Sequence, residues 1–288
     1  MTQFTKPDRF RIPPSEKVLL SERPTGESDF SLNKAAAQNE LKHCISILSK
    51  LQERLFAEKS QALLLIFQGM DASGKDSTIR HVTTGVNPAG VHVHSYGVPT
   101  QEDLAQSYFQ RHFRDLPAQG QIGVHNRSHY EEVVVTRVHP ALLQLRGFEA
   151  HEVDEEFWQE RFTDIRSFER HLTRQSRTKI IKFFLHISRA EQLKRLLQRL
   201  DDPTKNWKFD ISDIRERLYW DDYQFAYESA IAATSTEYAP WYVIPADQKR
   251  FSRLAIAEIV VSTLQELDPQ FPAPEADLKK AKHALLRT

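Results

Sequence analysis

Residues 62–67 read ALLLIF, and residues 69–75, which follow after a single glutamine, read GMDASGK. The first stretch is a short continuous apolar run, which is typical of a β-strand covered on both faces. The second stretch matches the Walker A pattern G-x-x-x-x-G-K, and a helical pattern follows from Lys75. A buried strand, a glycine-rich turn and a helix in this order predict a phosphate-binding P-loop. The alternative is an ordinary glycine turn, which the strand–turn–helix context disfavours.

The chemistry of this loop follows from its residue types. Gly69 and Gly74 permit a close approach of the backbone to an anion. Lys75 is expected to reach the outer phosphates. Asp76 stands where a Ser or Thr usually holds magnesium. Asp71 would repel a phosphate unless a cation lay between them, so we predict that Asp71 holds Mg²⁺; the alternative is that it caps the loop or faces solvent.

Strand and helix patterns alternate on both sides of the loop. Further strands are expected at residues 91–95, 121–125, 179–187 and 241–244. Helices are expected at residues 33–57, from Lys75, at 100–114 with a capping box of Thr100 and Asp103, around 157–172, after Ser188, and at 249–267. This alternation predicts an α/β protein with a parallel central sheet, whose ligands bind at the carboxyl ends of the strands.

The composition narrows the class of protein. The 288 residues allow one or two domains, and the 39 basic and 39 acidic side chains cancel, so neither nucleic acid nor a membrane is an expected partner. Cys44 is the single cysteine, and no apolar run is long enough to cross a bilayer. No secretory signal is visible, so we expect a cytoplasmic protein. We expect an N-terminal arm on the surface or on a partner subunit (1–30), one main domain (31–268) and a C-terminal tail (269–288).

A second group of polar residues follows the strand expected at 121–125. Residues 126–132 read NRSHYEE and lie at the end of the sheet where the P-loop is expected. Asn126 stands near the position of the usual metal-binding Asp, and Arg127 is suited to bidentate contacts with a phosphate. A structural alternative, compatible with the first, is that Ser128 caps a helix with Glu131 as its partner.

A basic break interrupts two helical stretches at residues 199–208, which read RLDDPTKNWK. In kinases such an insertion acts as a lid that brings cations onto the transferring phosphate, so we expect a lid around 199–215. The alternative is a solvated connection with Trp207 packed on the body. The other basic residues expected near the site are Arg80, Arg111, Arg114 and Arg137, for which a solvated helix surface is the alternative.

Several longer motifs occur in order: GMDASGKD (69–76), NPAGV (87–91), GVPT (97–100), NRSHYE (126–131), DPTKNWK (202–208) and STEYAPWYVIPA (235–246). With these motifs the chain resembles the polyphosphate kinase 2 family over roughly residues 8–274, and looks closest to members that phosphorylate both nucleoside mono- and diphosphates. The resemblance implies a three-layer P-loop kinase-like fold with a helical lid. It implies reversible phosphate transfer from inorganic polyphosphate to AMP or ADP, giving ADP or ATP, with Mg²⁺ or Mn²⁺. Guanine nucleotides as acceptors and a homo-oligomer are further expectations.

The matching motifs also imply residue roles. The catalytic residues would be Asp71, Lys75, Arg127 and Arg199, with Asp71 as the metal ligand. Many family members carry Asp where Asn126 stands, so Asp71 is favoured over Asn126 for the metal. Nucleotide binding would involve Asn126, Glu131 and Glu132. Phosphate binding would involve Gly69, Ala72, Ser73, Gly74, Lys75, Asp76, Arg80 and Lys208.

Two other functions remain open at this stage. An ATP-dependent kinase acting on a nucleotide or small metabolite would show a similar phosphate grip. A nucleotide-binding regulatory protein without turnover is the second rival, although a lid that excludes water argues against a static binder. The sequence leaves the base preference, the choice between AMP and ADP, the reaction direction and the oligomeric state undecided.

Overall fold

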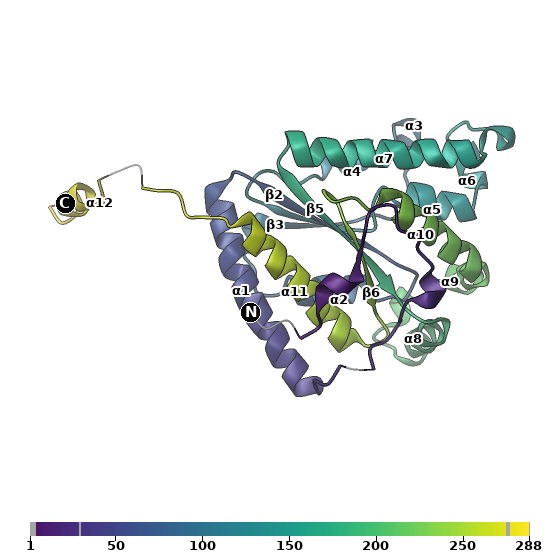
Figure 1. Ribbon diagram of the computed structural model, residues 1–288, viewed down its shortest axis with the longest axis horizontal. Coiled ribbons are helices and arrows are strands. Elements are labelled where there is room, and N and C mark those ends of the chain that lie inside the picture. Colours follow the sequence, from purple (N-terminus) through teal and green to yellow (C-terminus); the bar gives the residue numbers. More distant parts are fainter. Residues whose placement is uncertain (1–3, 29, 275–276, 288) are drawn as a thin grey trace.

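The computed structural model describes residues 4–28, 30–274 and 277–287 and is built around one six-stranded sheet (Figure 1). The strand order is β1-β6-β5-β2-β4-β3. The parallel strands are β2 (Ala62–Gln68), β3 (Val91–Ser95), β4 (Ile122–Asn126), β5 (Thr178–His186) and β6 (Trp241–Pro245). Each strand expected from the sequence is confirmed to within one residue at either end.

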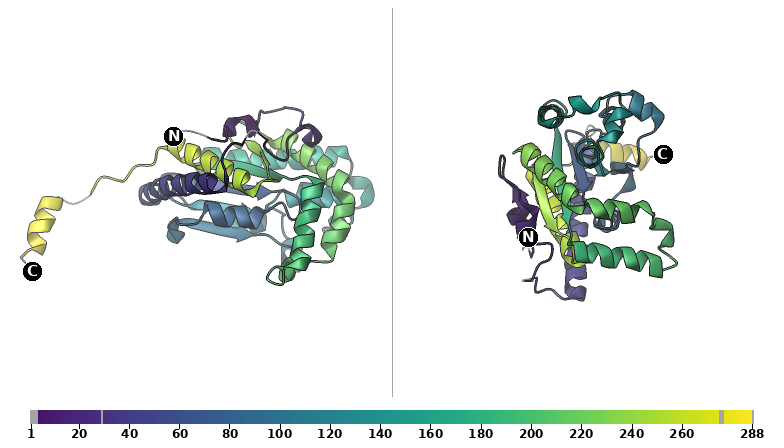
Figure 2. Two further views of the ribbon diagram at one scale, coloured as in Figure 1. Left: turned by 90° about the horizontal axis from the view of Figure 1, so that it is seen from below. Right: turned by 90° about the vertical axis from the view of Figure 1, so that its right-hand side faces the viewer.

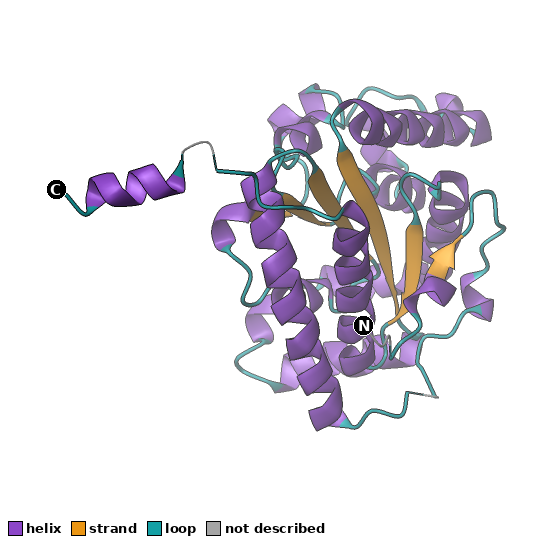
Figure 3. Ribbon diagram, turned by 60° about the vertical axis from the view of Figure 1, so that its left-hand side comes forward, coloured by secondary structure: helices purple, strands orange, loops and turns teal. Residues whose placement is uncertain are grey.

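Helices cover both faces of this sheet. The α-helices of the described residues, not all of which lie on the sheet, are α1 (Lys34–Glu58), α2 (Lys75–Val82), α3 (Gln101–Ala105), α4 (Gln110–Arg114), α5 (Glu131–Val138), α6 (Ala141–Gln144), α7 (Glu155–Gln175), α8 (Arg189–Asp201), α9 (Ser212–Glu216), α10 (Trp220–Thr234), α11 (Lys249–Leu267) and α12 (Leu278–Leu285). Figure 3 shows α1 and α11 side by side in front of the strands, and α2 packs against α11 in the same layer. Helices α5, α7 and α10 pack together on the opposite face. The three-layer α/β fold is therefore confirmed.

The central strands of the sheet determine where the predicted phosphate loop lies. β2 is buried along its whole length, as expected for a strand covered on both faces. It pairs in parallel with β4 on one side and β5 on the other. The chain therefore leaves β2 and β4 at the same edge of the sheet, which brings Gly69 and Asn126 into one region.

The single helix expected at residues 100–114 is wrong, because the structure has two short helices there. The predicted capping box does form: the Asp103 backbone N–H donates to Thr100 Oγ1 at 3.2 Å, and the Thr100 backbone N–H donates to Asp103 Oδ2 at 2.9 Å. Helix α3 ends at Ala105, and Gln106 is extended. Arg146 donates to the carbonyl oxygens of Asp103 and Gln106, so these carbonyls bind a side chain where a longer helix would bind backbone amides.

The segment expected as an N-terminal arm packs on its own chain. Its β1 (Arg11–Ile12) pairs antiparallel with β6, and Phe10 and Leu20 are buried in the main core. Residues 1–3 and 29 of the expected arm, like 275–276 and 288 of the expected tail, lie outside the described residues. In the described part of the tail, α12 buries no residue. None of the described helices has the length and apolar character needed to span a membrane.

Candidate active site

The turn after β2 has the geometry of a phosphate cradle. Gly69 and Gly74 have φ angles of 149° and 100°, and Ala72 between them is also left-handed at 60°. A Cβ on Gly69 would lie 2.9 Å from the carbonyl oxygen of Leu185 on β5, so the tight packing requires glycine. Helix α2 begins at Lys75, which directs its N-terminal amides toward the loop.

Lys75 lies inside this loop. Its Nζ donates to the carbonyl oxygens of Gly69 at 2.6 Å and Met70 at 3.2 Å, and the side chain is buried. Burial, with a smaller effect of Arg127, lowers the pKa of Lys75 to about 8. A cation held by weak carbonyl acceptors is suited to exchange them for phosphate oxygens.

Sequence reasoning missed Arg195 and Gln192, which brace the loop from α8. Arg195 Nη1 donates to the carbonyl oxygens of Ala72 at 3.1 Å and Ser73 at 2.8 Å, and Gln192 Nε2 donates to the carbonyl oxygen of Asp71 at 3.1 Å. Both side chains are buried. Gln192 and Arg195 lie three residues apart and therefore on one face of an amphipathic helix. This spacing of two long polar residues is the feature of the sequence that could have indicated their role.

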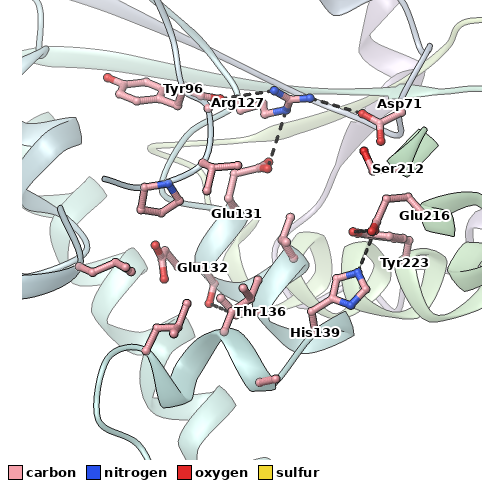
Figure 4. A pocket seen from close by; sticks show the side chains of 18 of the residues that line it. Asp71, Tyr96, Arg127, Glu131, Glu132, Thr136, His139, Ser212, Glu216 and Tyr223 are labelled. Carbon is pink, nitrogen blue, oxygen red and sulfur yellow. Dashed lines mark hydrogen bonds and ion pairs between the residues drawn. The ribbon is translucent and has the colours of Figure 1, made fainter. Parts of the chain in front are cut away.

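Arg127 joins the two predicted motifs. Its Nη2 lies 3.4 Å from Asp71 Oδ1 and its Nε lies 3.9 Å from Glu131 Oε2, while Nη1 donates to the Tyr96 carbonyl oxygen at 3.4 Å (Figure 4). Burial raises the pKa of Glu131, although Arg127 opposes this effect. The structure therefore brings Asp71, Arg127 and Glu131 together, as their motifs implied.

Asp71 fits the chemistry of a metal ligand. Its side chain is 34% exposed and lines the pocket described below, with Arg127 on one side. Mg²⁺ is usually bound through one or two carboxylates together with substrate phosphates, so one accessible carboxylate beside a phosphate loop suits it. Glu131 lines the same pocket.

Asn126 acts as a donor to the loop. Its Nδ2 donates to Asp76 Oδ1 at 2.9 Å and to Ser95 Oγ at 3.2 Å. Burial tends to raise the pKa of Asp76, but the Asn126 hydrogen bond and nearby cations outweigh it and lower this pKa. Lys208 of the lid is one of these cations, with its Nζ 3.6 Å from Asp76 Oδ2. Asp76 therefore stays ionised and links the lid to the loop.

Ser128 does not cap α5, so that structural alternative is wrong. Helix α5 begins at Glu131, and its N-cap Tyr130 makes no side-chain cap. Ser128 Oγ instead accepts from the Tyr130 backbone N–H and from Gln68 Nε2, each at 3.2 Å. The serine therefore fastens the turn to the end of β2.

The lid region projects from the body, and Figure 2 shows the green helices α8 and α10 extending together. Trp207 is 77% exposed, so the alternative of a Trp packed on the body is wrong. Arg199 Nη1 donates to Asp213 Oδ2 at 3.1 Å, which keeps this arginine within the lid in this conformation. Its catalytic role stays a prediction.

A pocket of about 780 Å³ opens beside the loop (Figure 4). Asp71 and Arg127 lie at its phosphate-loop end. Glu132 also lines it, but its Oε1 accepts from Arg146 Nη2 at 2.7 Å and its Oε2 lies 3.6 Å from Arg161 Nη1. Apolar side chains line another part: Val98, Pro99, Leu104, Val135, Leu142 and Leu145. The pocket thus combines a polar phosphate end with an apolar region of the kind that binds a ring system.

Of the other basic residues expected near the site, one lines this pocket and two lie elsewhere. Arg111 lines the pocket and donates to the Gly97 carbonyl oxygen at 3.0 Å. Arg114 lies on the surface, 3.6 Å from Asp103. Arg137 packs over Trp158, so a solvated helix surface does not describe it.

Several basic side chains lie at or near helix α2, which follows the loop. Arg253 Nη2 donates to Ser77 Oγ on α2 at 2.6 Å, and burial followed by the nearby Arg80 and Arg195 lowers its pKa. Burial followed by Arg195 and Arg253 likewise lowers the pKa of Lys249. We call Arg80, Lys249 and Arg253 the basic cluster. Mutually repelling cations beside a phosphate loop favour a polyanionic ligand.

Comparisons with known proteins agree with this geometry. The family profile Polyphosphate kinase 2 (PPK2) matches residues 31–272. An ADP-polyphosphate phosphotransferase of Rhodopseudomonas palustris is 43% identical over 98% of this chain and 99% of its own. An AMP/ADP-polyphosphate phosphotransferase of Meiothermus ruber is 45% identical over 94% of this chain and 98% of its own. The crystal structure of polyphosphate kinase 2 from Arthrobacter aurescens TC1 superposes with a TM-score of 0.91 at 34% identity, covering 100% of this chain and 99% of that one. The chain belongs to the polyphosphate kinase 2 family.

Proposed function

We propose that this protein transfers the terminal phosphate of inorganic polyphosphate to AMP or ADP, reversibly, to give ADP or ATP. The observation that carries the proposal is that two unlike groups of residues adjoin the phosphate loop and its helix α2. The basic cluster beside α2 suits a long polyanion, and the pocket with an apolar region suits a nucleoside. The names of the relatives from R. palustris and M. ruber support the same donor and acceptors.

The residues of the loop and turn supply positioning and charge. Lys75 and the α2 amides hold the transferring phosphate, and Arg127 grips it from the opposite side. Asp71, together with Glu131, would hold Mg²⁺ or Mn²⁺. The metal ion would neutralise part of the negative charge of the phosphates. Lys208 brings the lid toward the loop through Asp76, which helps to exclude water. No covalent intermediate with the protein is required.

One assay separates this proposal from its rivals. Purified protein is supplied with Mg²⁺ and either AMP or ADP, and with either polyphosphate or ATP as the donor, and nucleotide products are separated by chromatography. We expect ADP and ATP to form with polyphosphate. Product with ATP alone would establish an ATP-dependent kinase, and no product with either donor would favour a nucleotide-binding regulatory protein.

We further propose guanine nucleotides as additional acceptors, a homo-oligomeric assembly and a cytoplasmic location. GMP and GDP in the same assay test the first. Light scattering during size-exclusion chromatography tests the second. The expected N-terminal arm packs on its own core, so it adds no support for the assembly.

Removing the basic cluster is expected to weaken polyphosphate binding selectively. In the double variant Lys249→Ala/Arg253→Ala, the KM for polyphosphate should rise about tenfold, which corresponds to about 1.4 kcal/mol. The KM for AMP should stay within about twofold, since neither side chain lines the pocket. Steady-state kinetics with each substrate varied in turn measures both values. The matched control, Lys42→Ala/Lys50→Ala on the exposed face of α1, should change neither. Equal rises in both KM values would contradict the assignment of this surface to the donor.

The pH profile should report the protonation of Lys75. Its ammonium form predominates below a pKa of about 8, and the neutral amine predominates above it. Because only the ammonium attracts phosphate, kcat/KM for polyphosphate should fall as the pH rises through about 8 in the free enzyme. A profile from pH 6 to 10 measures this limb. The guanidinium of the Lys75→Arg variant stays charged over this range, so the kcat/KM that this variant retains should not fall as the pH rises. A wild-type kcat/KM that stays constant up to pH 10 would show the expectation to be wrong.

A further inference from the structure

A fully buried polar cluster lies beneath the turn that carries Arg127. Tyr130, Glu169, Lys182 and Thr234 all have zero exposed surface. Lys182 Nζ donates to Glu169 Oε2 at 2.6 Å, to the Tyr130 hydroxyl at 2.9 Å and to the Thr234 carbonyl oxygen at 2.8 Å. The Tyr130 hydroxyl in turn lies 2.8 Å from Glu169 Oε1 and 2.9 Å from Thr234 Oγ1. The three hydrogen bonds of the ammonium are thus satisfied inside the core.

The cluster connects separate elements of the fold to the side chain of Tyr130. Glu169 comes from α7, Lys182 from β5 and Thr234 from the end of α10. Tyr130 comes from the turn itself, three residues after Arg127 and one before Glu131. Arg127 and Glu131, which line the pocket, are therefore anchored through Tyr130 to two helices and a strand. The anchoring side chains Glu169, Lys182 and Thr234 do not line the pocket.

The turn needs such an anchor. Arg127 has a left-handed backbone with φ of 64°, which is unfavourable for a side chain of its size. Its backbone N–H donates to the Phe67 carbonyl oxygen at 2.9 Å, and Ser128 binds Gln68, so one side of the turn is fastened to β2. Tyr130 fastens the other side to the core. With both sides held, Arg127 keeps the direction that faces Asp71.

Stability alone does not account for a buried ion pair. Removing two charges from water costs several kcal/mol per ion, and well-packed apolar side chains of similar volume are often as stabilising. Lys182 and Glu169 each add to the Thr234 hydroxyl a directional contact with the Tyr130 hydroxyl, which apolar side chains would not provide. This contact fixes the tyrosine ring, and with it the path of the backbone between Arg127 and Glu131.

We propose that Tyr130, Glu169 and Lys182 form a positioning unit that holds Arg127 and Glu131 against the phosphate loop. The inference rests on the proposed function, since it assigns these three buried residues to phosphate transfer without any contact to substrate. It predicts that disturbing the unit lowers kcat more than it changes the KM for either substrate.

The Tyr130→Phe variant tests the unit by deleting one hydroxyl. We expect kcat to fall about 10- to 100-fold, as is typical when a group that orients a functional residue is lost. The KM values for polyphosphate and AMP should change less than about threefold. The control Tyr238→Phe deletes a hydroxyl that donates to the Arg166 carbonyl oxygen at 3.1 Å, away from the pocket, and should retain kcat. An unchanged kcat in Tyr130→Phe, beside an active wild type, would overturn the positioning role, whereas an inactive wild type would overturn the proposed function.

A second variant keeps the test decisive if the first is unstable. Glu169→Leu/Lys182→Met removes both charges together, so neither is left buried and unpaired. We expect it to fold with a thermal midpoint above that of either single variant, and to show the same selective loss of kcat. A folded double variant with the wild-type kcat would show that the cluster serves the fold alone and would overturn the proposal.

Discussion

Replacing Lys75 with alanine is expected to lower kcat for polyphosphate-dependent phosphorylation about 10²- to 10³-fold. Loss of one preorganised donor at a site of developing charge has an effect of this size. Lys75 is also the cation that the loop holds in its interior, bound to the Gly69 and Met70 carbonyl oxygens. The glycine conformations and the α2 amides that shape the cradle remain in the variant. Initial rates at saturating AMP, with circular dichroism to confirm folding, measure the effect.

The matched control for this variant is Lys50→Ala. Lys50 is exposed on α1, so its removal should leave the rate within about twofold of the wild type, as for other surface substitutions. A folded Lys75→Ala protein with the wild-type rate would remove the loop from the mechanism.

The Asp71→Asn variant is expected to have the second largest effect. The amide keeps the size of the side chain but loses the negative charge that attracts Mg²⁺. We expect kcat to fall roughly 10²-fold at a Mg²⁺ concentration that saturates the wild type, comparable to the loss of one electrostatic contact. The Mg²⁺ concentration that gives half-maximal rate should rise as well. A titration of rate against Mg²⁺ and, separately, Mn²⁺ measures both quantities.

Asp164→Asn on the exposed part of α7 provides the control, because it makes the same chemical change away from the pocket. It should leave the Mg²⁺ dependence unchanged. If Asp71→Asn lost rate without any shift in Mg²⁺ dependence, the carboxylate would act through Arg127, 3.4 Å away, and the metal assignment would be wrong.

The parallel sheet could be predicted mainly because its central strands β2 and β5 are buried on both faces. Residues 62–67 are a short continuous apolar run and residues 179–187 are mostly apolar, so burial on both faces leaves a strong signal in the sequence. The break after Ala105 could not be predicted in this way. It depends on Arg146 reaching the carbonyl oxygens of Asp103 and Gln106, and a contact across roughly 40 residues leaves no local pattern.

In the candidate site, the structure brings together residues that the motifs carried, whereas the sequence analysis missed residues that support them. Asp71, Lys75 and Arg127 have constrained spacings because the loop geometry fixes them. Arg195 and Lys182 act from other elements, so no spacing relates them to the loop. Arg199 shows a further limit: its charge suggested a phosphate contact, but the sequence contains no sign that Asp213 would bind it within the lid.

The pairing of β1 with β6 has a consequence for biosynthesis. Ile12 lies opposite Trp241, so roughly 230 residues must be translated between the two halves of this contact. At ordinary elongation rates of about 5–20 residues per second, the β1 segment waits roughly 10–50 s before its partner strand leaves the ribosome. During that interval Phe10 and Ile12, which are buried in the finished core, cannot make their contacts with Phe251 and Trp241. The β6 edge of the sheet can therefore close only after nearly the whole chain has been synthesised.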